Sequence, residues 1–235
     1  MNAGHLLIFA FIPSLLADPR LPARLSDLHI YSDLASGQVS TNYEPYSVNV
    51  SFWSDGADKE RWFRLPPDTK IKYHPNGPWE FPPGTMFVKE FQKPTNGASH
   101  RIETRVLYLD APSQITGATY RWNSDQSDAQ LVESTQVLTD DSNPTKGKGW
   151  FLPGPQDCRV CHTPVNGGVL GLNTRQLNLT LTDGSNQLVS LAQYMDVVPR
   201  DIASCSKLPR IDDRFKMTSA TNEILRITIT NTPRF

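Results

Sequence analysis

The fold of the chain is decided by TMFVKEF (residues 85–91), RIETRVLYL (101–109) and ATYRW (118–122). Each stretch is short, rich in β-branched and aromatic residues, and sets apolar side chains beside polar ones, as half-buried β-strands do. Turn-forming residues such as Asn96-Gly97 separate the stretches. Because short loops join strands that run in opposite directions, we expect consecutive antiparallel strands here.

Further strands are predicted outward from this centre, at residues 46–53, 61–65, 69–73 and 129–138, with Pro- and Gly-containing turns between them. Short helices are expected at residues 21–34 and 186–198, where apolar residues recur at near-helical spacing. No βαβ alternation is present, which argues against a dinucleotide-binding fold. The predicted class is therefore mainly β, an antiparallel sandwich-like fold with short flanking helices, and α+β is the alternative.

The composition and the charge balance argue against two classes of function. The chain has 235 residues, with 23 Lys and Arg against 24 Asp and Glu, and a formal net charge of −1. A general nucleic-acid binder or a polybasic membrane-surface protein would carry an excess of positive charge, so neither is expected. With 38% hydrophobic residues, the chain can build a core without cross-links.

The N-terminus resembles an export signal. Residues 6–17 are almost entirely apolar, too few to cross a bilayer but of the length of a secretory signal core, although no Lys or Arg precedes them. We expect a signal peptide at 1–17, a β-rich domain at 18–200, and a weakly structured or truncated tail at 201–235. The mature protein would be periplasmic or secreted, without a membrane span. Asn49 and Asn178 begin Asn-x-Ser/Thr triplets, whose glycosylation the sequence leaves open.

One motif carries chemistry: Cys158-Arg159-Val160-Cys161-His162, a C-x-x-C-H sequence. This is the attachment signature of haem c. Two thiols three residues apart on a helical turn can form thioethers with the two vinyl groups, and His162 can ligate the iron. The expected cofactor is one covalent haem c on Cys158, Cys161 and His162.

Other interpretations of the cysteines stay open. A redox C-x-x-C pair, a zinc half-site completed by Cys205 and a distant His, and a structural disulfide or degenerate haem site each account for part of the pattern. The sequence does not identify the sixth ligand of the haem iron. Met195 is the first candidate, ahead of Met86 and Met217 and of the histidines at positions 29, 74 and 100.

Charged and aromatic residues give weaker signals. The polar run 53–61 is expected to be a solvated turn in which carboxylates pair with Lys59 and Arg61. Glu103 and Arg105, with Arg121, are expected to form a cross-strand ion pair. The five Trp residues could line a sugar platform, although core packing is the simpler use. A secreted β-sandwich binding module, with carbohydrate as a candidate ligand, is therefore the alternative function, and a small haem enzyme with an open iron is a third.

Several long segments resemble the N-terminal β-rich region of an exported, usually dihaem, bacterial c-type cytochrome family: PYSVNVSFWSDGADKERWFRLPPDTKI, WEFPPGTMFVKEF, RIETRVLY, YRWNSDQSDAQLV and DCRVCHTPVNGGVLGLNTRQLN. The resemblance covers residues 21–195. It implies haem c at Cys158, Cys161 and His162, and electron transfer with a redox partner, with a sugar dehydrogenase as a candidate because relatives occur near or fused to such domains.

The chain departs from that family in one respect, because a second C-x-x-C-H is absent from its 235 residues. This puts an electron relay between two haems in doubt for this chain. WEFPPGTMFVKEF also resembles a smaller β-rich haem protein family in which a sheet lysine is cross-linked to the haem, and Lys89 is the nearest counterpart here.

Overall fold

The computed structural model describes residues 21–95, 98–139 and 149–197, together with Cys205, Leu208 and Arg210. The predicted signal peptide at 1–17, most of the predicted tail at 201–235 and Met217 lie outside the described residues, as does the Asn96-Gly97 turn. Among the described residues, no helix is long and apolar enough to cross a membrane.

The centre of the molecule is a six-stranded sheet in which every neighbouring pair is antiparallel. Its strands follow one another in chain order: β3 (Glu44–Pro45), β4 (Asp58–Arg64), β5 (Met86–Thr95), β6 (Ala98–Ala111), β7 (Gln114–Trp122) and β8 (Ala129–Leu131). The three stretches that open the sequence analysis are its three longest strands. The prediction of a mainly β, antiparallel fold with short helices is confirmed.

In the described part of the chain, two small sheets and six short helices surround this centre. The small sheets pair β1 (Tyr31–Asp33) with β2 (Gln38–Val39), and β9 (Gln136–Leu138) with β10 (Trp150–Leu152). The helices are η1 (Leu25–Leu28), α1 (Pro155–Cys161), η2 (Pro164–Asn166), α2 (Thr174–Leu177), α3 (Gln187–Leu191) and η3 (Ala192–Tyr194). The expected helix at 186–198 is therefore confirmed as α3 and η3, and that at 21–34 is reduced to η1.

Two strand predictions were wrong. Residues 46–53 form a loop, although their side chains alternate, because their backbone groups bond to other partners: Ser47 N donates to Gln187 Oε1 (2.7 Å) and Asn49 N donates to the Gln176 carbonyl (2.8 Å). Residues 69–73 make only isolated bridges, Ile71 with Met195 and Lys72 with Glu80. In both places the ladder that would complete a strand is replaced by other contacts.

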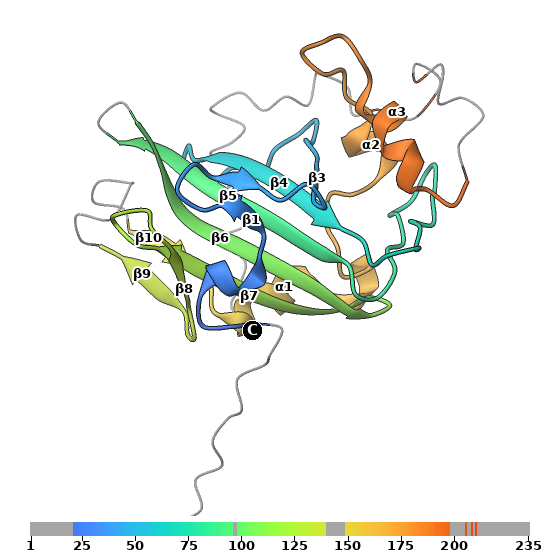
Figure 1. The fold of residues 1–235 in the computed structure, drawn as a ribbon. Helices are drawn as coiled ribbons and strands as arrows, with labels where there is room; N and C mark the ends of the chain where they lie inside the picture. Colours follow the sequence, from blue (N-terminus) through green and yellow to red (C-terminus); the bar gives the residue numbers. More distant parts are fainter. Residues whose placement is uncertain are drawn as a thin grey trace, which may run out of the picture.

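The two faces of the central sheet are covered differently. Residues directly opposite each other in antiparallel strands share a face. Lys89 of β5 is opposite Arg61 of β4 and Arg105 of β6, and Arg105 is opposite Thr119 of β7. We call this side the α1 face, because α1 packs against it at Gly117. Figure 1 shows α1 behind the sheet, with η1 and β1 in front of it.

Apolar side chains bury most of both faces. On the side opposite α1, the sheet residues Val88, Val106 and Ala118 pack with Leu25 and Ile30 of the N-terminal segment. The α1 face carries two separate clusters. One gathers around Phe63, Phe87, Leu109 and Ile115 with the helical segment 169–195, and the other gathers around Phe91, Trp150 and Leu152. Charged side chains occupy the sheet between these two clusters.

Candidate functional site

The cysteines are presented by a helix whose start is fixed locally. Pro155 takes the first helical position after Gly154, where its missing N–H costs nothing. The Asp157 carboxylate accepts hydrogen bonds from Gly154 N (2.9 Å) and from the Thr135 hydroxyl (2.5 Å). The helix ends at Cys161, and the N–H of His162 donates to the Cys158 carbonyl (3.0 Å). Cys158, Cys161 and His162 therefore stand within one helical turn, as the spacing predicts.

Gly117 lets this turn approach the sheet. A Cβ at position 117 would lie 2.7 Å from Cys158 Sγ and 2.8 Å from Cys158 Cβ, distances that real Cβ atoms do not adopt. Cys158 is therefore half-buried against β7, and burial raises the pKa of its thiol. Cys158 is half-buried, whereas Cys161 is exposed. The two thiols thus face different environments, and the disulfide interpretation gains no support.

One hydrogen bond to the backbone orients the His162 ring. Its Nδ1 lies 2.8 Å from the Gly168 carbonyl, and Gly168 has φ +75°, a conformation that favours glycine. Burial lowers the pKa of His162, and the positive charges of Lys89 and Arg105 lower it further. A neutral ring that donates Nδ1–H to a carbonyl keeps a lone pair on Nε2, which is the tautomer used by metal-bound histidines.

Four cations lie on the α1 face: Lys59, Arg61, Lys89 and Arg105, which we call the basic cluster. The charges of two of them, Lys89 and Arg105, act on His162. Burial lowers the pKa of Lys89 to about 7, with the neighbouring positive charges of Arg61, Arg105 and Lys59 contributing next. Burial likewise lowers the pKa of Lys59 to about 8, and that of Arg61. The cluster is therefore a concentration of like charge in a half-buried position.

One carboxylate stands within the cluster and is already engaged. Glu103 is fully buried and accepts two hydrogen bonds from Arg105, at 3.0 and 2.6 Å, and a third from Trp150 Nε1 at 3.2 Å. The expected ion pair of Glu103 is thus formed with Arg105 of its own strand. Among the residues that the structure describes, no carboxylate lies within ion-pair distance of Lys59, Arg61 or Lys89. The expected local pairing of Lys59 and Arg61 in a solvated turn was therefore wrong.

The remaining sequence candidates lie away from this turn or have other contacts. Met195 is 4% exposed in the apolar core, where it bridges Ile71, and its role as sixth ligand stays a prediction. Met86 accepts a hydrogen bond from Tyr43 on the opposite face of the sheet. His74 pairs with Glu80 at 2.6 Å. His29 ends η1 with φ +52°, and His100 lies in β6 opposite Lys93. Sequence reasoning alone could not rank these positions.

The described residues give little support for a zinc site or for an aromatic sugar-binding platform. No group of three or more His, Cys, Asp or Glu side chains comes together there to hold a metal ion. Cys205 packs against the apolar core. Trp79, Trp122 and Trp150 are buried, so they cannot form a flat sugar-binding surface.

The residues present fit a haem c. The donor set is chemically complete for its attachment, with two thiols and an imidazole of suitable tautomer in one turn. A buried polar atom also lies on this face, since the Thr119 hydroxyl, opposite Arg105, has no hydrogen-bond partner among the described residues. Sequence reasoning missed Arg105 and Gly117 as neighbours of the motif, because only the pairing of strands and the docking of α1 bring them there.

Comparison of the chain with protein-family models, with curated proteins and with solved structures finds no match. The function is therefore inferred from the site and from the sequence.

Proposed function

We propose that this protein is an exported c-type cytochrome that carries one covalent haem and transfers electrons. The observation that carries the proposal is the end of α1, where Cys158 packs against the sheet at Gly117 and Cys161 and His162 follow within four residues. Haem attached there would supply one-electron iron chemistry. Each thiol would add its S–H across one vinyl double bond, so attachment needs no oxidant.

The residues around the motif have defined tasks in this proposal. Gly117 allows α1 to lie on β7, and the Gly168 carbonyl orients the His162 ring. The apolar cluster around Phe87 and Leu109, against which Cys158 packs, keeps water from one side of the turn. Burial of this kind raises the reduction potential, because the environment disfavours the more highly charged ferric state.

Three further elements of the proposal rest on the sequence. Met195 is proposed as sixth ligand, residues 1–17 as the export signal to the periplasm or medium, and a dehydrogenase, with a sugar dehydrogenase as first candidate, as electron donor. The resemblance to exported c-type cytochromes supports the export signal and the electron donor, whereas Met195 is proposed from its place in the helical segment after the motif.

A second candidate function is suggested by the edge of the sheet. A cleft of about 450 Å³ lies beside β4, and the exposed rings of Phe52 and Trp53, at 58% and 39%, line it. Exposed aromatic side chains at a cleft are typical of ligand-binding sites. The alternative is therefore a secreted binding module in which the cysteine pair carries no haem.

The proposed function is tested by a pyridine haemochrome spectrum of protein expressed in the periplasm of a host with cytochrome c maturation machinery. We expect one haem per chain that resists acid–acetone extraction and shows the α-band of two thioethers. Cys158→Ser with Cys161→Ser should abolish covalent haem, whereas the control Cys205→Ser should retain it. A colourless protein from a host that matures a control cytochrome would refute the haem proposal and favour the binding module.

A further inference from the structure

The basic cluster brings like charges together on one face of the central sheet. Three of its cations have no carboxylate within ion-pair distance among the described residues, and Glu103 is occupied by Arg105 and Trp150. Half-buried like charges repel one another and lose hydration, so they destabilise a fold unless an anion compensates them. Lys89 and Arg105 lie over the Phe91 ring, at 4.7 and 4.6 Å from its centroid, which offsets part of this cost. Among the described residues, Lys59 and Arg61 have no such ring contact, and an anion would offset the remainder.

Space and a further donor lie beside the same cations. Lys59 and Arg61 line the 450 Å³ cleft, together with Ser51, whose hydroxyl accepts a hydrogen bond from Arg61 Nη2 (3.1 Å). Asp58 also lines the cleft and is its one carboxylate. Across the sheet, the buried Thr119 hydroxyl is unpartnered beside Arg105. Amines, guanidinium groups and hydroxyls are the donors that bind oxyanions.

We propose that Lys59, Arg61 and Lys89 form a carboxylate-binding site on the α1 face. Arg61 supplies a planar pair of donors, and the two lysines supply charge. The carboxylate has two possible sources: the propionate groups of a haem attached at His162, or a free organic acid that enters through the cleft. The site itself is independent of the proposed function, and only its assignment to propionate rests on that function.

The test uses the sign of one mutational effect. Without an anion, Lys89→Gln removes a desolvated charge that its neighbours repel, so the variant should be more stable than its parent. With a carboxylate bound, the same change removes a partner of the ligand and should be destabilising. The haem-free parent is the full chain with Cys158→Ser and Cys161→Ser, and its folding is checked by circular dichroism.

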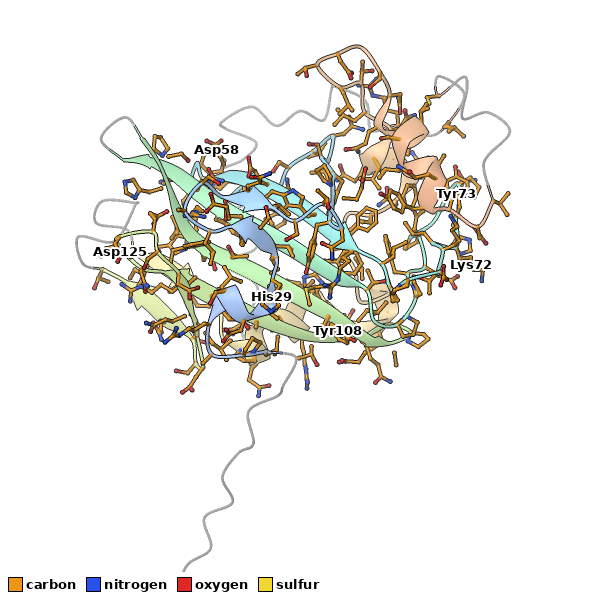
Figure 2. All side chains as sticks on the ribbon, in the orientation of Figure 1. His29, Asp58, Lys72, Tyr73, Tyr108 and Asp125 are labelled. Carbon is orange, nitrogen blue, oxygen red and sulfur yellow. The ribbon has the colours of Figure 1, made fainter. Side chains whose placement is uncertain are left out.

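In the haem-free parent, Lys89→Gln should raise the melting temperature by about 2–4 °C, the shift that corresponds to relief of a modest destabilisation in a chain of this size. Adding sodium succinate, against sodium chloride at equal ionic strength, should reverse the sign. Lys72→Gln is the matched control, because Lys72 pairs with Glu80 and lies at the other end of the molecule from Asp58, which lines the cleft (Figure 2). Its effect should have the same sign in every solution.

The haem-loaded protein identifies the source. A destabilising Lys89→Gln there, without succinate, assigns the site to propionate, whereas a stabilising effect that succinate reverses assigns it to a free acid. The proposal is overturned if Lys89→Gln stabilises every form and succinate changes nothing, or if it destabilises the anion-free parent. Because the succinate experiment needs no haem, a chain that fails to take up haem still tests the site.

Discussion

Replacing Gly117 by Ala tests whether the close approach of α1 to β7 holds the motif in place. The added Cβ would lie 2.7 Å from Cys158 Sγ and 2.9 Å from Leu107 Cδ2, whereas ordinary contacts start at 3.4 Å. The helix must therefore move outward by roughly 0.7 Å. Overpacking of a well-packed site costs about 1–3 kcal/mol. Replacing glycine also lowers the conformational entropy of the unfolded chain, which stabilises the folded state by about 0.4–1 kcal/mol. We therefore expect a net destabilisation of about 1–2 kcal/mol.

The assay is urea unfolding of purified protein, with haem per chain measured on the same samples. Gly77→Ala is the control, since a Cβ there would meet only His74 Cβ at 3.8 Å and the backbone is not strained. That variant should match the parent or be slightly more stable. If Gly117→Ala unfolds at the parental urea concentration and keeps its full haem content, then α1 does not depend on this contact and the reasoning is refuted.

Two further outcomes follow from the charged residues. Glu103→Gln leaves Arg105 without its carboxylate in a largely buried setting, so urea unfolding should show a loss of about 3 kcal/mol, and an unchanged midpoint would contradict the role given to that pair. In a buffer without carboxylates, the haem-free chain should become more stable as the pH rises from about 7 towards 10. The folded pKa values of Lys89 (about 7) and Lys59 (about 8) lie below that of an unfolded lysine. The unfolded state therefore binds more protons in this pH range, and raising the pH favours the folded state. Melting temperatures against pH should show this rise, and Lys89→Gln should flatten it while Lys72→Gln leaves it intact.

The central strands could be predicted because their information is local. Residues 85–91 and 101–109 carry apolar side chains on both sides, and both faces of the sheet are buried. The same local pattern misled at residues 46–53, where Ser47 and Asn49 bond to the helical segment that lies more than a hundred residues later. Alternation describes which side chains can be buried, but not which partner the backbone will find.

The motif itself could be identified from the sequence, whereas the basic cluster on the same sheet face could not. Cys158, Cys161 and His162 are adjacent in the sequence, so their joint presentation needs only a helical turn. The basic cluster depends on the register that sets Arg61, Lys89 and Arg105 side by side across three strands. A shift of one residue in any strand would send its cation to the opposite face. No pattern within a single segment encodes that alignment.

The unequal burial of the two thiols has a consequence for biogenesis. Cys161 stays exposed in the folded chain, while Cys158 packs against β7 at a glycine that leaves no spare room. Covalent chemistry at Cys158 is therefore easiest before α1 docks. Because α1 follows β7 in the chain, the sheet can be complete while the motif is still undocked. In the proposed cytochrome, haem attachment at Cys158 would therefore compete with the docking of α1 on β7, whereas Cys161 would stay accessible.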